Sequence, residues 1–221
     1  MKILGLIALL SKNLPFSYLW IFDRVMGSNI NTVLDLGCGE GNTMHDVSLG
    51  GSWEITGIDL HKKSVEQARQ SGIYKKVILG DVIKESEKLV KKGQKYDLVF
   101  CSQVVEHIEE HEGQKLLGLA EELAKKNIVV TTPNGYVDQH ERFIKQNPFH
   151  EHKSGWETED FTKRDYKVYG MGFGILWSGN KLSKIDNKLL RGILMLISYI
   201  LAPISFYFPR VSAGLIAVKK K

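Results

Sequence analysis

One short segment, Thr32–Thr43 (TVLDLGCGEGNT), constrains the fold of this chain more than any other. An apolar run that ends in an acid is followed at once by Gly37, Gly39 and Gly41 at alternate positions. Glycine is placed where a backbone turns through positive φ or approaches another group closely, and it loses much conformational entropy on folding. The segment therefore predicts a strand, a tight turn and a helix, with a ligand bound at the turn.

Short apolar runs rich in β-branched residues recur after this point, with helix-like segments between them. We predict strands at Val33–Leu36, Ile55–Ile58, Val77–Leu79, Leu98–Cys101 and Ile128–Thr131. We predict helices at Glu40–Leu49, Lys63–Gln70, Ile83–Lys92 and Glu112–Lys125. Because strands without a polar face are covered by helices on both sides, the pattern predicts an α/β fold with a doubly wound parallel sheet.

The composition excludes several classes of protein. The net charge is +5, but basic and acidic residues are interleaved and no nucleic-acid-binding motif occurs, so we expect no nucleic-acid partner. Cys38 and Cys101 both stand beside apolar runs, which predicts neither a disulfide framework nor a cysteine metal site and fits a reducing cytoplasm. The apolar N-terminus lacks a small-x-small cleavage site, so we prefer a helical lead-in to a secretory signal.

Acids at the ends of the first three predicted strands indicate the ligand. Asp35 precedes the glycine turn and can accept a hydrogen bond from an ammonium group, while N–H groups of the turn meet a carboxylate. Asp59 can accept hydrogen bonds from both hydroxyls of a ribose. Asp81 can accept one from the amino group of an adenine, with Val82 against the face of the base. Amino acid, ribose and adenine in this order describe S-adenosylmethionine (SAM).

Five stretches carry a family resemblance: VLDLGCGEGN, GIDLHKKSVEQAR, LGDVI, YDLVFCSQVVEHI and NIVVTTPNG. In order and spacing the chain resembles a class I SAM-dependent methyltransferase over about residues 30–135. VVEHI is further similar to the subgroup that includes ubiquinone and menaquinone methyltransferases. The resemblance implies a Rossmann-like sheet of seven mostly parallel strands, the last antiparallel. It also implies further cofactor contacts at Cys38, Leu60, Ser102 and Gln103.

The segment His107–His111 reads HIEEH, which matches the His-x-x-Glu-His pattern of zinc peptidases and would place two imidazoles on one helical face. The cofactor motifs already account for this neighbourhood, so we expect no metal. Glu106 and His107 are predicted on the floor of the cleft, below the methionine end of SAM. A purely structural role for His107 stays open.

The segment after the fifth strand is polar, aromatic and rich in histidine, and the family keeps its acceptor site there. His140, His150 and His152 lie in it, and a histidine can act as a general base near neutral pH. Phe149 and Trp156 can wall an apolar acceptor. A metal site built from the three histidines is a weaker alternative.

We therefore expect a methyltransferase that moves the methyl group of SAM to a small-molecule, lipid or glycan acceptor, at oxygen, with His150 or His152 removing the proton. An NAD-dependent oxidoreductase would share the fold and Asp59, but the Gly-x-Gly-x-Gly spacing lacks a pyrophosphate cradle. A non-catalytic SAM-binding protein or membrane adaptor would keep the glycine turn without the acceptor chemistry.

The 221 residues, 43% of them hydrophobic, most simply form one domain. Its predicted parts are a helical lead-in (1–29, with a helix at Tyr18–Met26 on the domain edge), a SAM-binding core (30–135), an acceptor-side loop and helix (136–165, with the helix at Glu157–Arg164), an apolar insertion (172–212) and a last strand with a basic tail (213–221). Two more strands are predicted at Lys167–Met171 and Gly214–Val218.

The insertion contains Leu189–Pro209 (LLRGILMLISYILAPISFYFP), which has no charge from Gly192 to Phe208. Pro203 predicts two short helices in a hairpin that dips into one leaflet or covers the acceptor cleft. Basic residues flank it: Lys181, Lys184, Lys188, Arg191, Arg210 and Lys219–Lys221. We expect a cytoplasmic protein that attaches peripherally to the inner face of the membrane and takes a lipid-linked acceptor. Packing on the protein's own core or in a homodimer is the alternative.

Overall fold

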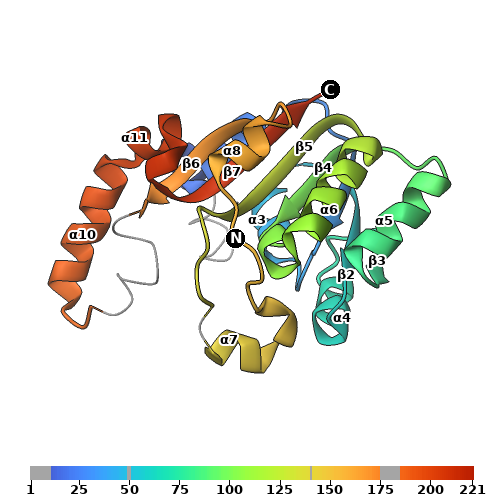
Figure 1. Ribbon diagram of the computed structural model, residues 1–221, viewed down its shortest axis with the longest axis horizontal. Coiled ribbons are helices and arrows are strands. Elements are labelled where there is room, and N and C mark those ends of the chain that lie inside the picture. The colour runs from blue at the N-terminus through green and yellow to red at the C-terminus, as the bar shows by residue number, and fades with distance from the viewer. Residues whose placement is uncertain (1–10, 49–50, 140, 175–184) are drawn as a thin grey trace.

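Seven strands form one sheet in this computed structural model, which describes residues 11–48, 51–139, 141–174 and 185–221, without the side chains of residues 142 and 143. The strand order is β3-β2-β1-β4-β5-β7-β6 (Figure 1). The strands are β1 Thr32–Leu36, β2 Glu54–Asp59, β3 Lys76–Leu79, β4 Tyr96–Ser102, β5 Ala124–Pro133, β6 Lys167–Phe173 and β7 Ser212–Lys220. Strands β1 to β5 are parallel, and β7 lies antiparallel between β5 and β6. The seven-stranded, mostly parallel fold with an antiparallel last strand is confirmed.

Helices connect the strands close to the predicted positions. They are α2 Tyr18–Val25, α3 Asn42–Val47, α4 Lys62–Gln70, α5 Val82–Lys91, α6 Glu110–Leu123, α7 Glu141–Gln146, α8 Thr158–Thr162, α10 Lys188–Ile200 and α11 Ala202–Tyr207. Single 3₁₀ turns are η1 Val105–His107, η2 Pro148–His150 and η5 Pro209–Val211.

Several predicted boundaries differ from the observed ones by a few residues, and at two of them the physical reason is clear. Helix α3 begins at Asn42 rather than Glu40, because Gly41 still has φ 90° and cannot be helical. Ala124 and Lys125, predicted as helix, begin β5, because Ala124 pairs with Tyr96 of β4. The predicted helix end at Leu49 is among the residues that the structure does not describe.

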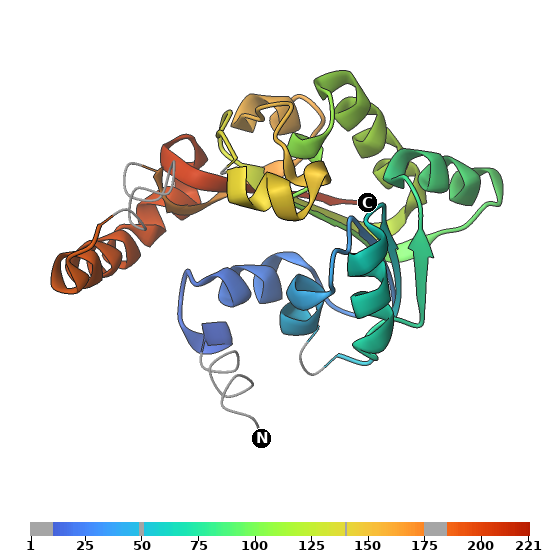
Figure 2. The same ribbon diagram turned by 90° about the horizontal axis from the view of Figure 1, so that it is seen from below.

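Helices cover both faces of the sheet (Figure 2). On one face α5, α6 and α8 pack against the inward residues of the strands, among them Leu34 of β1 and Val99 of β4. On the other face α2, α3 and α11 pack against alternate residues of the same strands, such as Val33 and Leu98. This double cover explains why β1 and β4 have no polar face, since successive side chains of a strand point to opposite sides.

The N-terminal helix is placed differently from our expectation. Helix α2 does not lie on the edge of the domain. Its Ile21 and Phe22 are buried on the face of the sheet, where the Phe22 ring meets Phe100 of β4 edge-on at 5.5 Å. Ser17 caps the helix by accepting a hydrogen bond from Trp20 N. Helix α2 is therefore part of the core.

The apolar insertion forms two helices, as predicted, but they do not fold back on each other as a hairpin. Helix α11 lies against β6, where a Cβ at Gly170 would approach Ser205 O to 2.1 Å and the Phe206 ring stacks on Tyr169 at 4.7 Å. Helix α10 instead projects from the body of the molecule (Figure 1), and Ser198 is its buried residue. One half of the insertion is core, and the other half is exposed.

The glycine turn yields a test of packing. Gly37 has φ 70°, and an added Cβ would lie 2.3 Å from Val104 Cγ2; Gly72 has φ 74° with nothing within 4 Å. Both alanine variants bear the cost of a left-handed backbone, but Gly37→Ala adds an overpacking cost of about 1–3 kcal/mol. We expect urea unfolding to show Gly37→Ala less stable than Gly72→Ala by that margin. Val104→Ala should restore most of the difference, and equal stability of the two variants would contradict this packing.

Candidate functional site

A cavity of about 720 Å³ opens at the carboxyl ends of β1, β2 and β4, next to the point where the strand order reverses between β1 and β4. Most of the predicted site residues line it: Gly37, Cys38, Gly39, Asp59, Leu60, Asp81, Val82, Ser102, Gln103, His107, His150 and His152. Two predicted residues, Asp35 and Gly41, are not among its lining residues. Further residues that the sequence analysis did not single out also line the cavity, among them Thr43, Ser64, Glu112 and Lys153.

The three positions of the turn that are occupied by glycine differ in what a side chain would contact there. All three have positive φ, 70° at Gly37, 53° at Gly39 and 90° at Gly41. An added Cβ would strike Val104 at Gly37 and Tyr74 at Gly41, so these two positions are required by the protein's own packing. At Gly39 a Cβ would meet nothing within 4 Å, although Gly39 lines the cavity. Gly39 therefore leaves open the space that a ligand against the turn would fill.

Asp59 holds the glycine turn in place. Its Oδ2 accepts a hydrogen bond from Gly39 N at 2.8 Å, and its Oδ1 accepts one from His61 N at 2.8 Å. Gly37 N and Cys38 N both donate to Ile58 O, at 2.8 and 3.0 Å. A carboxylate has about four acceptor sites, so Asp59 keeps capacity for two ligand hydroxyls while it binds the turn.

Asp35 lies beneath the turn instead of facing the cavity. It is buried, and Tyr74 Oη donates a hydrogen bond to its Oδ2 at 2.6 Å. Burial raises the pKa of the Asp35 carboxyl to about 7; the Tyr74 hydrogen bond lowers it, and the charge of Asp59 raises it further. The expected direct contact of Asp35 with an ammonium group does not fit this position, because the side chain is directed at Tyr74.

Asp81 has a structural role that the sequence analysis did not assign. It is the N-cap of α5, and its Oδ1 accepts hydrogen bonds from Ile83 N and Lys84 N, both at 3.0 Å. Asp81 and Val82 also line the cavity, so their contact with an adenine stays a prediction.

Cys38, Ser102 and Gln103 complete the floor near the glycine turn. Burial raises the pKa of the Cys38 thiol, so Cys38 contributes its backbone and a small neutral side chain. Ser102 Oγ is hydrogen-bonded to Thr131 Oγ1 at 2.9 Å. Gln103, directly after β4, has φ 55°, a backbone conformation that non-glycine residues rarely adopt and that is often found at functional sites.

The histidines come together across the mouth of the cavity. His107 lies in η1 after β4, His150 ends the 3₁₀ turn η2 that follows α7, and His152 lies in the loop after η2. This loop is tied to η1, because Lys153 N and Ser154 N donate to Glu106 O at 2.7 and 3.2 Å. The His107 ring lies 5.8 Å from that of His150 and 4.8 Å from that of His152. His140 lies outside the described residues.

The environment of each of these groups decides its charge. Burial lowers the pKa of His107 to about 4, and partial burial also lowers the pKa of His150. Both imidazoles are therefore neutral at pH 7 and able to accept a proton or bind a cation. Glu106 is only 2% exposed; burial raises the pKa of its carboxyl to about 8, although Thr132 Oγ1 donates to it at 3.1 Å.

One expectation for this region is wrong, and one sequence pattern that we set aside is ruled out. Trp156 does not wall the cavity: it is 1% exposed, packs against Phe161 and donates its Nε1–H to Ser154, whereas Phe149 is 49% exposed and lines the cavity. The HIEEH segment is not one helix, because Ile108 is extended at φ −121° and ψ 162° between η1 and α6. His107 and His111 therefore do not share a helical face.

The sequence profile of the family described as "Methyltransferase domain" matches residues 28–182, which is more than half of the chain. The chain belongs to this family. A SAM-dependent methyltransferase from Archaeoglobus fulgidus has the same fold with a TM-score of 0.60 at 21% identity, over 96% of this chain and 95% of that one. The match confirms the assignment as a class I SAM-dependent methyltransferase and excludes the NAD-dependent oxidoreductase. Membership of the subgroup that includes quinone methyltransferases stays a prediction.

Two further solved structures are similar to this methyltransferase. The methyltransferase domain of bacterial CtHen1 aligns with a TM-score of 0.53 at 20% identity, over 93% of this chain and 97% of that one. The plantazolicin methyltransferase BpumL, solved in complex with SAH, aligns with a TM-score of 0.54 at 16% identity, over 98% of this chain and 84% of that one. No curated protein matches the sequence. At these identities the likeness shows the shared fold.

The cavity of this methyltransferase suits SAM. Its volume lies in the usual range of small-molecule sites, and the open space at Gly39 and the remaining acceptor sites of Asp59 face it. Gly39 and Asp59 belong to different strand ends and are joined by one hydrogen bond, so a ligand that contacts both is held by a single rigid unit.

Replacing Asp59 tests this site. Asp59→Ala removes the acceptors for two ribose hydroxyls, each worth about 1.5–3 kcal/mol, and it leaves Gly39 N and His61 N without their partner. We expect calorimetric titration to show SAM and SAH binding at least tenfold weaker. Asp46→Ala, which removes an exposed carboxylate paired with His45, should leave the affinity unchanged. Unchanged affinity in a folded Asp59→Ala variant would contradict the assignment.

Proposed function

We propose that this methyltransferase transfers the methyl group of SAM to a hydroxyl oxygen on the polar end of a lipid-like acceptor, at the surface of an anionic membrane. SAM would bind with its ribose on Asp59, its adenine beside Val82 and its amino-acid end at the glycine turn. When bound, SAM supplies an electrophilic methyl group. The chain's own residues have to orient the acceptor, exclude water and accept one proton.

The observation that carries this proposal is a second, apolar cavity that shares the lining residue Gln103 with the first one. Its volume is about 780 Å³, and Gln103 lines both cavities. Its walls come from the start of α2 and the segment before it, from the loop after β5, from β6, and from α10 and the start of α11: Leu14, Phe16, Tyr18, Val137, Met171, Met195, Tyr199 and Ala202. An acceptor with an apolar tail in this cavity would present its polar end at Gln103, beside the SAM cavity.

The histidines at the mouth of the SAM cavity support oxygen as the methylated atom. A hydroxyl oxygen needs its proton removed as it attacks, and a neutral imidazole can accept it. The lowered pKa of His150 keeps its ring neutral at pH 7, and His150 and His152 both line the cavity. We assign proton removal to one of these two histidines, as the sequence analysis proposed.

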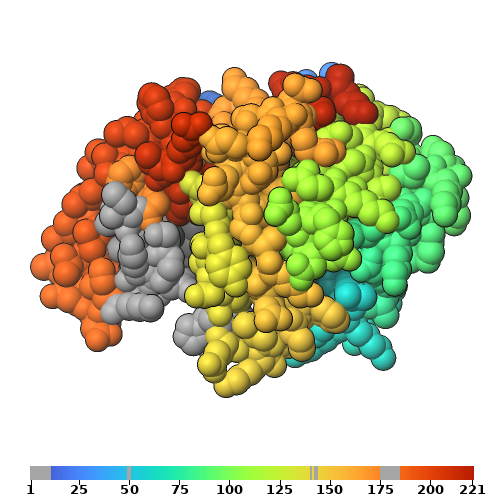
Figure 3. Space-filling view, viewed as in Figure 1, coloured from blue at the N-terminus to red at the C-terminus, as the bar shows by residue number. Residues whose placement is uncertain are grey.

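The exposed helix α10 supports a membrane surface as the place of reaction. Its outer residues are apolar and solvent-exposed, with Leu189 75% and Ile200 64% exposed, and Tyr207 and Phe208 extend the patch. Figure 3 shows α10 at one margin of the molecule. In the described part of the chain, no helix is long and apolar enough to cross a membrane. A partial insertion of α10 into one leaflet fits these dimensions.

The cations around this patch differ in what they can offer a membrane. Lys188 and Arg191 lie in the first turn of α10, next to the apolar surface. Arg210 already pairs with Glu159, and Lys219 Nζ donates to Arg164 O and lies 3.5 Å from Glu121, so Lys219 is directed at the protein. Lys181 and Lys184 lie outside the described residues. We therefore assign headgroup contacts to Lys188 and Arg191.

A test of the acceptor uses labelled SAM with a total lipid extract. We expect label to appear in an extractable lipid whose mass increases by one methyl group. Met195→Asp places a charge in the apolar cavity and should abolish this labelling with SAH affinity unchanged, because Met195 does not line the SAM cavity. Labelling of water-soluble acceptors alone, equal in both proteins, would overturn the lipid proposal.

A second test measures vesicle binding by flotation. Leu196→Glu/Ile200→Glu adds two charges to the exposed face of α10, and we expect it to abolish binding to anionic vesicles; binding of the unchanged protein should fall as salt rises. Leu79→Glu is the control, since Leu79 is 44% exposed on β3 at the opposite edge of the sheet. If the unchanged protein does not float with vesicles but is a dimer in light scattering, and the two charges dissociate this dimer, α10 is instead a contact between two copies of the chain.

A further inference from the structure

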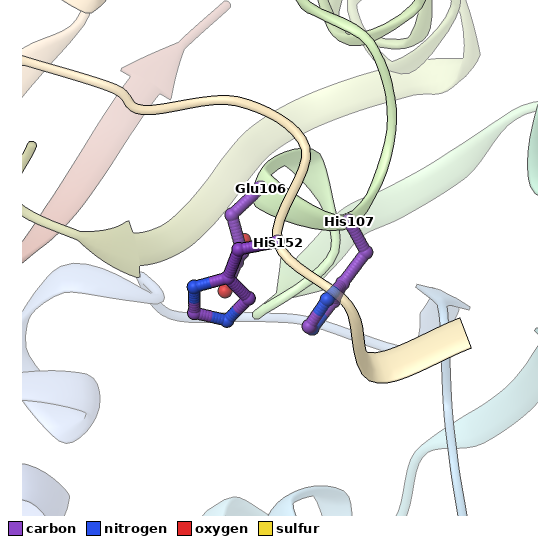
Figure 4. Close-up of side chains that lie close together, drawn as sticks. All are labelled: Glu106, His107 and His152. Atoms are coloured by element: carbon purple, nitrogen blue, oxygen red, sulfur yellow. The ribbon is translucent and has the colours of Figure 1, made fainter. Parts of the chain in front are cut away.

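Three side chains form a cluster beside the SAM cavity, and the proposed methyl transfer does not assign a role to all of them; two of the three, His107 and His152, line the cavity, and Glu106 is buried behind them. Glu106, His107 and His152 each offer one nitrogen or oxygen atom, and these atoms all lie within 4.8 Å of one another (Figure 4). Glu106 and His107 are adjacent in η1, whereas His152 comes from the loop after α7 and faces them across the space between the two segments.

The hydrogen bonds of the two imidazoles determine which nitrogen is available. His107 Nδ1 lies 3.1 Å from Glu151 O, and His152 Nδ1 lies 2.5 Å from Val137 O. Because a backbone carbonyl can only accept, each Nδ1 carries the proton and each Nε2 carries a lone pair. Metal-binding histidines typically donate their other N–H to a carbonyl or carboxylate in this way. The contact of His152 Nε2 with the Gln139 amide, at 3.4 Å, is long and easily displaced.

Glu106 brings a buried acid to this cluster. Its carboxyl group accepts a hydrogen bond from Thr132 Oγ1 at 3.1 Å. In the Gln103 amide orientation that places the nitrogen toward Glu106, Gln103 also donates to Glu106 Oε1 at 3.1 Å. Both donors are neutral, and within the described ranges no Lys or Arg forms an ion pair with Glu106. Ionising a buried carboxyl group without a nearby cation is costly, and a metal ion would supply the positive charge that stabilises the carboxylate form.

We propose that Glu106, His107 and His152 bind one divalent transition-metal ion at the acceptor end of the SAM cavity. Metal–ligand bonds of about 2.0–2.2 Å place neighbouring ligand atoms roughly 3–3.5 Å apart, so modest side-chain rotations close the set around an ion. Two imidazoles and one carboxylate favour Mn²⁺, Fe²⁺, Co²⁺ or Zn²⁺ over Mg²⁺ and Ca²⁺, which prefer oxygen ligands. Three protein ligands leave coordination positions for a substrate.

The position of the ion gives it a role in methyl transfer, and this role rests on the proposed function. His107 and His152 line the SAM cavity, so a hydroxyl of the acceptor can occupy an open coordination position. Coordination lowers the pKa of a hydroxyl, and His150 accepts its proton. The acceptor oxygen then forms a bond to the methyl carbon while the electron pair of the S–CH₃ bond stays on sulfur. Deprotonation would therefore be shared between the ion and one histidine.

The binding test uses the full chain after treatment with a chelator. We expect titration with Co²⁺ to give visible absorption bands that saturate at one equivalent, and calorimetry with Mn²⁺ and Zn²⁺ to give the same stoichiometry. His107→Ala and His152→Ala should each weaken binding at least tenfold. His111→Ala is the matched control, because His111 is exposed at the start of α6 and is not a member of the cluster, and it should leave binding unchanged.

Folding and function are checked separately from metal binding. Circular dichroism should stay unchanged in both cluster variants, and Glu106→Gln, which keeps the shape of the side chain, should also weaken metal binding. Absence of one-equivalent binding, or binding that the cluster variants leave intact, would overturn the site whether or not methyl transfer occurs. If the cluster binds metal but methyl transfer continues after chelation, the metal site is retained and its role in deprotonation is overturned.

Discussion

The hydrogen bonds between the turn after β1 and the end of β2 are the interaction on which the rest of the site depends. Gly37 N and Cys38 N bind Ile58 O, and Gly39 N binds the Asp59 carboxylate. The turn contains three residues with left-handed backbone conformation, and ordering these glycines costs conformational entropy. The hydrogen bonds offset this cost and keep the turn in one conformation. The same carboxylate that orders the turn faces the cavity, so cofactor binding and local folding share one side chain.

A second constraint is the burial of two carboxyl groups near the cavity without a cationic partner among the residues that the structure describes. Asp35 is satisfied by the Tyr74 hydroxyl and Glu106 by the Thr132 hydroxyl, and burial raises the pKa of both. The two sites differ in what lies beside them. Asp35 is enclosed beneath the turn, whereas Glu106 lies next to two imidazoles at the mouth of the cavity. A cation can reach the second group, and this difference separates a structural acid from a candidate ligand.

The apolar insertion divides its hydrophobic surface between two purposes. Helix α11 completes the core against β6, where Gly170 permits a close approach of the helix backbone. Helix α10 precedes α11, with one residue between them, and leaves most of its leucine and isoleucine side chains exposed. An exposed apolar surface of this kind is unfavourable in water unless something covers it. The apolar cavity beside α10 continues from this surface to Gln103, which links the exposed helix to the catalytic end of the molecule.

The sequence by itself determined the elements whose signal is local. The apolar runs, the glycine turn and the acids at strand ends predicted the parallel sheet, the cavity-lining residues from Gly37 to Gln103 and the family, because each lies within one strand and its following turn. Only the tertiary structure decided that Trp156 is buried and Phe149 lines the cavity, that α2 covers a face of the sheet, and that His152 meets Glu106 and His107. The physical reason is that these contacts join segments far apart in the chain. Hydrophobic periodicity indicates that a residue is buried, but it does not show which residue packs against it. The path of each loop decides which segments meet.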